Sequence, residues 1–223
     1  MEYEYIGREA VNVHRLIIYC EGPTEESFIN TILYPYLFHR DIFVTPITKH
    51  GIENHIIMKN QLLKICNAHS SATITTMFDL YGLPDNTPGI DDTFRTIYEK
   101  VQHVEAAIEA GLGKPRNLFF NLMLHEFEGL LFTDISAFID VADAGAITKL
   151  QEIKDDPNFP TPEHINNTKD TAPSKRIKAI VPTYSKVRHG TSIAQSIGIE
   201  AISSQCHHFK NWIDKITNLE NIR

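Results

Sequence analysis

The sequence predicts an α/β fold, in which a mostly parallel sheet of about four strands is flanked by helices. In residues 1–133, short and nearly continuous apolar runs alternate with longer amphipathic segments, the order typical of parallel strands joined by helical crossovers. Strands that are apolar along their whole length favour a sheet covered on both faces. After residue 133 the strand-like runs stop and short amphipathic segments follow. We therefore expect an α/β domain over residues 1–133 and a helical C-terminal region over residues 134–223, packed on it as one structural unit.

Four segments have the composition of buried strands. They are rich in β-branched and other apolar residues, and turn-forming or acidic residues follow them. Pro46 cannot donate a backbone hydrogen bond, so it favours an edge position for the second strand. The predicted strands cover residues 13–20, 41–48, 72–78 and 117–124.

Helices are expected between and after these strands. Thr24, followed by Glu25 and Glu26, has the pattern of an N-cap with acids in the first turn, and Pro35 is expected to kink or end that helix. The clearest helix is predicted over residues 91–111, because it starts with acids, ends at glycine and has one apolar stripe. Further helices are predicted over residues 53–69, 174–181, 189–197 and 199–216.

The composition indicates an ordinary soluble globular protein. Hydrophobic residues make up 42% of the 223 residues and charged residues 22%, which excludes a disordered chain. The net charge of −7 argues against a protein that coats nucleic acid, so any such affinity must come from a local patch. Cys20, Cys66 and Cys206 form no CxxC pair and are expected to be buried thiols. With no apolar run of membrane-spanning length, we expect a cytoplasmic protein without a membrane partner.

Carboxylates follow the ends of three predicted strands. Glu21 follows the first strand, Asp79 the third, and Glu126 with Glu128 the fourth. Ligands of parallel sheets bind beyond the carboxyl ends of the strands, where four carboxylates repel one another unless a divalent cation or raised pKa values compensate. Donor sets made of oxygen alone suit Mg²⁺ or Mn²⁺ better than zinc. The sequence therefore predicts a Mg²⁺ or Mn²⁺ site formed by these four residues.

Some acids near this edge have alternative roles. Glu25 and Glu26 are expected to be helix-capping residues rather than ligands. Because Glu126 and Glu128 are two residues apart, they share one face only in an extended chain, and a helix starting at Glu126 would point one of them away. The string HEFEG lacks the spacing of a zinc-protease helix. His125 is either a site residue or a histidine satisfied at the sheet edge.

A basic segment follows in the C-terminal region. Between Lys169 and His189, six lysines and arginines stand against a single acid. Such a run is either a solvated helix face or a surface that contacts phosphate. Ser174 lies near an expected helix N-terminus, where backbone N–H groups favour anions. The predicted phosphate- or substrate-binding residues are Ser174, Lys175, Arg176, Lys186 and His189.

Several motifs together resemble a known family. YCEGPTEESF, TTMFDLYGLP, LHEFEGLLF, TAPSKR, YSKVRHG and CHHFKNW occur in the order seen in an uncharacterised bacterial domain-of-unknown-function family. The resemblance extends from Val13 to Trp212. That family in turn is similar to the Toprim superfamily, the metal-binding, Rossmann-like fold of topoisomerases, primases and OLD-type nucleases.

The resemblance implies roles for individual residues. Toprim domains place a glutamate after the first strand and an Asp-x-Asp pair after a later one, so Glu21 matches the glutamate and Asp79 the first aspartate. Tyr81 stands where the second aspartate is expected, and a phenol is a poor Mg²⁺ ligand. Glu126 or Glu128 would therefore have to replace it.

The leading hypothesis is a Toprim-type nuclease or phosphodiesterase that requires Mg²⁺ or Mn²⁺ and acts on nucleic acid. Asp79, with Glu126 or Glu128, would hold the cation, and Glu21 would be a further ligand or the general base. The expected catalytic residues are Glu21, Lys175 and Arg176. The expected second layer around the site consists of Glu25, Tyr81 and His125.

Two other functions remain open at the level of sequence. The first is a catalytically degenerate Toprim-like module that binds an ATPase partner or nucleic acid without cleavage, which Tyr81 and the net acidity favour. Similar proteins occur beside ATPases in defence-type gene neighbourhoods, so the resemblance implies an ATPase partner and a role in defence. The second is a small-molecule phosphotransferase, for which the sequence shows no substrate pocket.

Overall fold

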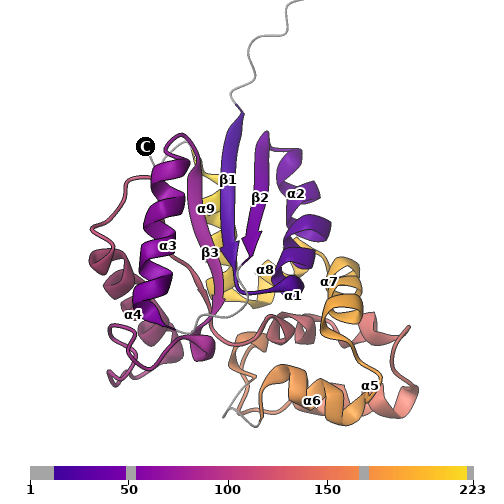
Figure 1. Cartoon of the computed structure of the whole chain (residues 1–223). Helices are drawn as coiled ribbons and strands as arrows, with labels where there is room; N and C mark the ends of the chain where they lie inside the picture. Colours follow the sequence, from indigo (N-terminus) through magenta and orange to yellow (C-terminus); the bar gives the residue numbers. More distant parts are fainter. Residues whose placement is uncertain (1–12, 49–53, 166–170, 220–223) are drawn as a thin grey trace, which may run out of the picture.

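The computed structural model describes residues 13–48, 54–165 and 171–219, and its centre is a four-stranded parallel sheet in the order β2-β1-β3-β4 (Figure 1). The α/β prediction is confirmed, and the strand that carries Pro46 lies at an edge of this sheet. The strands are β1 (His14–Cys20), β2 (Ile42–Thr48), β3 (Thr73–Asp79) and β4 (Leu122–Met123).

Helices flank the sheet and make up the C-terminal part of the described chain (Figure 1). The α-helices are α1 (Pro23–Phe28), α2 (Tyr34–Phe38), α3 (His55–Ala68), α4 (Ile97–Gly111), α5 (Ala144–Lys154), α6 (Pro173–Ile180), α7 (Thr191–Ile197), α8 (Ile199–Gln205) and α9 (His207–Thr217). Short 3₁₀ turns are η2 (Leu80–Gly82), η3 (Phe127–Thr133), η4 (Ile135–Phe138) and η5 (Pro162–His164). Wider π turns are η1 (Ile29–Leu33) and η6 (Lys186–Gly190). No helix in this part of the chain is both long and apolar enough to cross a membrane.

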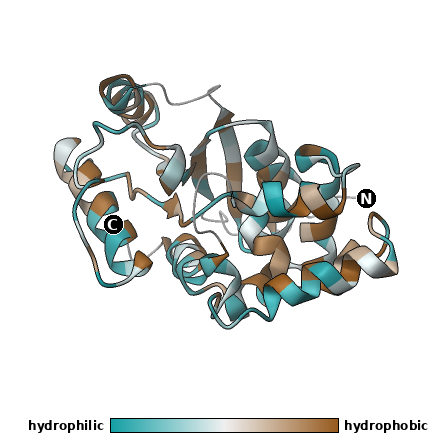
Figure 2. Ribbon diagram, turned by 90° about the horizontal axis from the view of Figure 1, so that it is seen from below, coloured by the Kyte–Doolittle hydropathy of each residue, from teal (hydrophilic) through white to brown (hydrophobic). Residues whose placement is uncertain are grey.

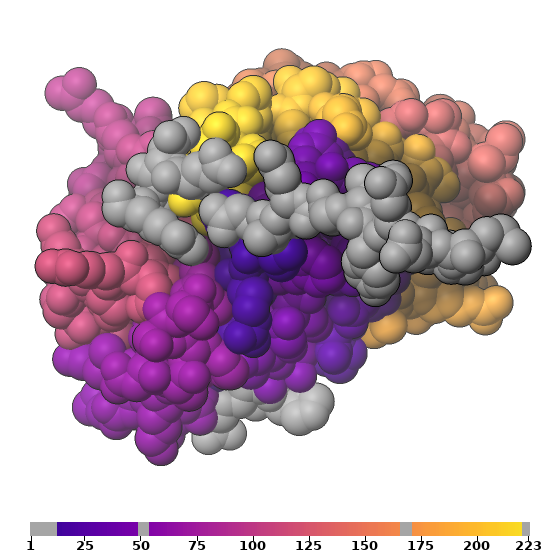
Figure 3. All heavy atoms as spheres, turned by 90° about the horizontal axis from the view of Figure 1, so that it is seen from above, coloured from indigo at the N-terminus to yellow at the C-terminus, as the bar shows by residue number. Residues whose placement is uncertain are grey.

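The two faces of the sheet are covered by different helices. Successive strand residues point to opposite faces, so Leu16 and Ile18 of β1 join one core cluster while Tyr19 joins another. The first cluster includes residues of α1, α9 and the helices after residue 134, whereas the second includes residues of α3 and α4. Seen from above, the C-terminal helices and α3 and α4 lie on opposite sides of the N-terminal strands (Figure 3). The central strands β1 and β3 are thus buried on both faces, as expected, whereas the edge strand β2 has exposed residues such as Phe43 on one face.

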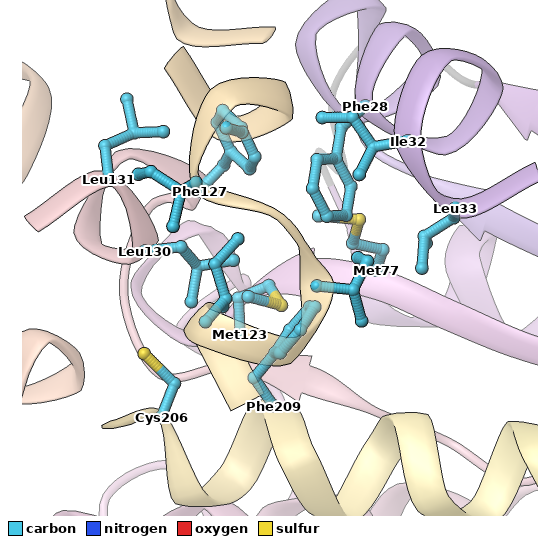
Figure 4. Close-up of a cluster of buried hydrophobic side chains, with 14 of the residues drawn as sticks. Phe28, Ile32, Leu33, Met77, Met123, Phe127, Leu130, Leu131, Cys206 and Phe209 are labelled. Atoms are coloured by element: carbon cyan, nitrogen blue, oxygen red, sulfur yellow. The ribbon is translucent and has the colours of Figure 1, made fainter. Parts of the chain in front are cut away.

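Aromatic side chains join the C-terminal region to the sheet. Phe28 of α1 lies 5.0 Å from Phe127 and 6.2 Å from Phe209 between ring centroids, within the cluster shown in Figure 4. Trp212 of α9 is fully buried, and its Nε1 donates to Thr75 Oγ1 of β3 at 3.0 Å. Viewed from below, the C-terminal helices carry both hydrophilic and hydrophobic residues (Figure 2), as expected for elements packed on one side only. A domain boundary at residue 133 stays a prediction.

The fourth strand is much shorter than predicted. Over residues 117–124 only Leu122–Met123 form a ladder with β3, preceded by one isolated bridge at Leu118. Carboxylates of α4 take the place of strand partners, because Phe120 N donates to Glu109 at 2.7 Å and Leu122 N to Glu105 at 2.8 Å. These tertiary hydrogen bonds satisfy the backbone of the edge segment without a regular strand.

Helix boundaries near the first strand also differ from the prediction. Gly22, not Thr24, is the N-cap of α1, and Glu25 Oε2 accepts from Gly22 N at 3.0 Å. The capping role expected for Glu25 is therefore confirmed. Pro35 does not end the helical segment, which continues to Phe38, because the wide turn η1 precedes it and Pro35 lies in the first turn of α2, where no N–H is needed.

Two later helices are also shorter in the structure than the sequence predicts. The helix expected from residue 91 begins at Ile97, where Thr96 Oγ1 accepts from Glu99 N at 3.1 Å as its cap. The helix expected over residues 199–216 is broken at Cys206, whose extended backbone separates α8 from α9. The start predicted at residue 53 lies outside the described residues. All three cysteines are buried and free, as expected.

Candidate functional site

The parallel strands bring their terminal acids to one edge of the sheet. Glu21 follows β1 directly and Asp79 is the last residue of the adjacent strand β3, so both lie at the lower end of the sheet in Figure 1. The chain turns sharply after Asp79 in η2. At Gly82, the third residue of this turn, a Cβ would lie 3.2 Å from Glu21 Oε2, so the small residue leaves room for the Glu21 carboxylate.

The next two acids meet a lysine from the C-terminal region. Lys186 Nζ lies 3.1 Å from Glu126 Oε1 and 3.4 Å from Glu128 Oε2. Glu126 is the extended residue before η3 and Glu128 lies in its first turn, so both carboxylates reach the same ammonium. A helix starting at Glu126 would have pointed one of them away, but the chain is extended at Glu126 and 3₁₀-helical only after it.

The N-terminus of α6 holds Glu126 from the other side. Ser174 N donates to Glu126 Oε2 at 2.9 Å, so the helix end predicted to bind a phosphate binds a carboxylate of the same chain. Glu128 is 1% exposed, and its Oε1 is buried without a hydrogen-bond partner. A buried carboxylate oxygen left in this way is costly, and it points to a missing ligand.

Glu25 completes a group that we call the carboxylate cluster. It lies one turn into α1, and the charge of Glu21 acts on it. A hydrogen bond joins α1 to the C-terminal region, since Thr191 Oγ1 donates to Ser27 Oγ at 3.0 Å. The carboxylate cluster consists of Glu21, Glu25, Asp79, Glu126 and Glu128.

Burial and mutual repulsion change the pKa values of the acids in the cluster. Burial, and then the charges of Glu25 and Glu21, raise the pKa of Asp79 well above its ordinary value. Burial raises the pKa of Glu128 to about 7, although Lys186 opposes this change. Burial alone would raise the pKa of Glu126, but hydrogen bonds from Ser174 and the charge of Lys186 lower it. The cluster thus holds more negative charge than the lysine balances.

The π turn η6 packs closely against two aromatic side chains. Lys186 opens this turn, which ends at Gly190. A Cβ on Gly190 would lie 2.7 Å from Tyr184 Oη and 3.3 Å from a ring carbon of Phe127, so a larger residue here would force one of these side chains to shift. Wide turns of this kind occur frequently at functional sites.

Tyr81 and His125 form the rim of the cluster. Their rings stack with centroids 5.1 Å apart and planes inclined by 28°. His125 is buried, and burial followed by the charge of His164 lowers its pKa to about 4, so its ring is neutral at neutral pH. Tyr81 by contrast is 57% exposed. These contacts place His125 beside the site as a support for Tyr81.

The predicted basic residues do not gather into one phosphate site. Arg176 Nε donates to Thr171 O at 2.7 Å and its guanidinium lies 5.0 Å from the Phe159 ring, so this side chain has a local structural role. His189 Nδ1 accepts from Ser185 N at 3.1 Å. The side chain of Lys175 is exposed on α6. Lys169 lies outside the described residues, whereas Lys186 contacts Glu126 and Glu128 of the cluster.

A second buried polar group was missed by the sequence analysis. Glu163 accepts hydrogen bonds from His208 N at 3.1 Å, Phe209 N at 2.8 Å and Tyr98 Oη at 3.0 Å. His208 Nε2 lies 3.0 Å from Glu105 Oε1. No local sequence signal marks these residues, because they are far apart in the chain. We call Tyr98, Glu105, Glu163 and His208 the α9 network.

The carboxylate cluster supplies the donors that a hard cation prefers. Its ligand atoms are all oxygens, and Glu128 Oε1 is unpartnered. In the described part of the chain, however, no three acidic, histidine or cysteine side chains are already arranged as a group that could hold a metal ion. The residues fit Mg²⁺ or Mn²⁺ in kind, and binding requires the carboxylates to move together.

Comparisons with known proteins give a family. One solved structure is similar, the C-terminal region of the OLD protein of Xanthomonas campestris pv. campestris, with 15% identity over 96% of this chain and 100% of that chain. Its TM-score of 0.36 is too low to establish a common fold. Among curated proteins, none matches. The family model described as domain of unknown function DUF4276 matches residues 20–217, and the chain therefore belongs to this family.

Proposed function

We propose that this protein is a Toprim-type phosphodiesterase that acts on nucleic acid and requires Mg²⁺ or Mn²⁺. The observation that carries the proposal is a group of five acids that act on one another at the carboxyl edge of a parallel sheet, two of which, Glu126 and Glu128, contact Lys186. Among the described residues, the buried Glu128 Oε1 has no hydrogen-bond partner. This edge is where parallel sheets bind their ligands. A divalent cation would supply the missing positive charge.

Individual residues have distinct tasks in this proposal. Asp79 and Glu128 hold the cation, since Asp79 lies at the carboxyl end of β3 and Glu128 has a buried oxygen with no hydrogen-bond partner among the described residues. Glu21 is either a further ligand or the base that accepts a proton from the attacking water. The cation, when bound, would offset charge on the phosphate and acidify water.

Lys186 and the N-terminus of α6 complete the site from the C-terminal region. Ser174 N fixes the orientation of Glu126, and Glu126 with Glu128 in turn fixes the ammonium of Lys186. A positive charge held in this way stabilises negative charge that develops on a substrate phosphate. Arg176 has local contacts with Thr171 and Phe159, and the catalytic roles expected for Lys175 and Arg176 stay predictions.

A second candidate is the non-cleaving module. Lys186 already pairs with two of the acids, and within the described residues no metal-binding group is assembled, which favours a site that has lost its cation. Such a module would bind nucleic acid or an ATPase partner in a defence system, as the resemblance implies.

Cleavage assays distinguish these two functions. We would incubate labelled single-stranded and duplex DNA and RNA with wild type, Asp79→Asn and Asp214→Asn in Mg²⁺, Mn²⁺ or EDTA. Asp214 is a matched control, because its carboxylate is exposed and pairs with Lys210 on the surface of α9. The proposal expects metal-dependent cleavage that Asp79→Asn reduces at least 100-fold and Asp214→Asn leaves unchanged. Absence of cleavage by wild type in every metal, or full activity of Asp79→Asn, contradicts it.

A further inference from the structure

We propose that Tyr81 is a stacking platform for an unpaired nucleobase, which makes single-stranded nucleic acid the substrate of the carboxylate cluster. This inference rests on the proposed function, because it names the substrate class of the same site. It starts from an aromatic side chain that is 57% exposed at the rim of a buried acidic site. Such a ring is neither core nor metal ligand.

The Tyr81 ring is held flat by its partner. His125 lies under it at 5.1 Å with an inclination of 28°, and the histidine itself is buried. One face of the phenol ring is therefore covered while the other is open to solvent. A ring that is oriented in advance loses little conformational entropy when a second planar group stacks on it.

The chain places this ring close to the acids. Asp79 ends β3, and Tyr81 is the middle residue of the 3₁₀ turn that follows. Because a chain spans at most about 3.6 Å per residue, the Cα atoms of these two residues are no more than about 7 Å apart. On the other side, His125 directly precedes Glu126, whose carboxylate contacts Lys186. A nucleotide whose base stacks on Tyr81 therefore has its phosphate within reach of the cluster.

Other exposed aromatic residues differ from Tyr81. Phe38 of α2 and Phe43 of β2 are also exposed, but they pack on each other with ring centroids 5.3 Å apart. They lie at the opposite end of the sheet, where β2 begins. Tyr81 is distinguished by a buried supporting ring and by its position beside the acids.

An unpaired base is the ligand whose chemistry matches this arrangement. Every nucleobase offers a planar π face, so stacking on an aromatic ring binds single strands with little sequence preference. Bases inside a duplex are already stacked and would have to be extruded at a cost of a few kcal/mol. The phosphate next to the base is negatively charged, so a cation held by the acids would attract it.

Binding of oligonucleotides with and without bases tests the inference. The probes are single-stranded DNA and RNA 12-mers that carry one 2-aminopurine, the matching duplexes, and a fully abasic 12-mer, all in Ca²⁺. The variants are Tyr81→Ala and Tyr81→Phe, with Phe38→Ala as the control for an exposed aromatic residue far from the site. We expect Tyr81→Ala to weaken binding of at least one single strand about 10-fold and to abolish 2-aminopurine quenching. Tyr81→Phe and Phe38→Ala should bind like wild type.

The abasic probe gives an independent readout. It should bind wild type as weakly as the normal strand binds Tyr81→Ala, and the substitution should not weaken it further. Equal affinity of wild type and Tyr81→Ala for both single strands, or a preference for duplex, overturns the inference.

Failure of the inference and failure of the proposed function give different results. Metal-dependent cleavage with binding that is independent of Tyr81 overturns the inference alone. Tyr81-dependent binding without cleavage in Mg²⁺ or Mn²⁺ supports the inference and overturns the phosphodiesterase.

Discussion

The carboxylate cluster and the α9 network each contain buried or half-buried acids, yet their chemistry differs. In the α9 network, Glu163 receives three hydrogen bonds and Glu105 meets both His208 and a backbone N–H. In the carboxylate cluster, by contrast, Glu128 Oε1 has no hydrogen-bond partner among the described residues, and burial, followed by the charges of Glu25 and other acids, raises the pKa of Asp79. Within the described residues, the acids of the α9 network have hydrogen-bond partners, whereas one oxygen of Glu128 in the carboxylate cluster has none.

This difference indicates which group stabilises the fold and which carries function. A buried polar network in which every atom is satisfied adds rigidity, whereas like charges held together cost stability. Proteins keep such costly arrangements where they bind a ligand. Substitutions in the two groups should therefore change stability in opposite directions.

The largest expected effect on stability is in the α9 network. Glu163→Ala should reduce the free energy of unfolding by about 3 kcal/mol, because the buried N–H groups of His208 and Phe209 and the phenol of Tyr98 lose their acceptor. Urea denaturation would measure this loss. Glu152→Ala, on the exposed side of α5, serves as control and should change stability by less than about 0.5 kcal/mol. A loss equally small for Glu163→Ala would remove the contrast between the two groups.

A smaller effect is expected in the pH dependence of stability without metal. The pKa of Glu128 is about 7 in the folded protein, above its unfolded value, so its contribution is present below about pH 4.5 and is lost as pH rises through 7. Wild type in EDTA should therefore lose on the order of 2–3 kcal/mol more than Glu128→Gln between pH 4.5 and 8. Parallel stability curves for the two proteins would show that Glu128 titrates normally.

The smallest expected effect is a gain in stability. Asp79→Asn should raise the free energy of unfolding at pH 7.5 in EDTA by about 1 kcal/mol, because a carboxyl with a raised pKa must either take up a proton on folding or ionise among repelling acids, and an amide does neither. Thermal melting would show the gain, and Asp214→Asn should show none. A destabilised Asp79→Asn would mean that this carboxylate supports the fold, as Glu163 does.

Local patterns predicted the elements that depend on them. The apolar runs before Glu21 and Asp79 are buried strands, and parallel pairing brings these acids to one edge, as parallel topology requires. The short β4 could not be predicted, because Glu105 and Glu109 of α4 take over its backbone hydrogen bonds. That competition exists only once α4 is packed beside the segment.

In the candidate site, too, local patterns predicted single features but not the contacts between residues far apart in the chain. The sequence predicts an anion site at the N-terminus of α6, but the anion held there is Glu126, 48 residues earlier in the chain. The basic run contains Lys186, but its pairing with Glu126 and Glu128, about 60 residues away in the chain, has no local signal. The α9 network could not be predicted, because its residues are far apart in the chain and no local pattern distinguishes them from other polar residues.

Titration of Mn²⁺ by calorimetry tests whether the carboxylate cluster binds a divalent cation. We expect wild type to bind Mn²⁺, Asp79→Asn to bind it at least 100-fold more weakly, and Asp214→Asn to bind it like wild type. Equal binding by wild type and Asp79→Asn, or no binding by wild type, would contradict the claim that the carboxylate cluster is a divalent-cation site.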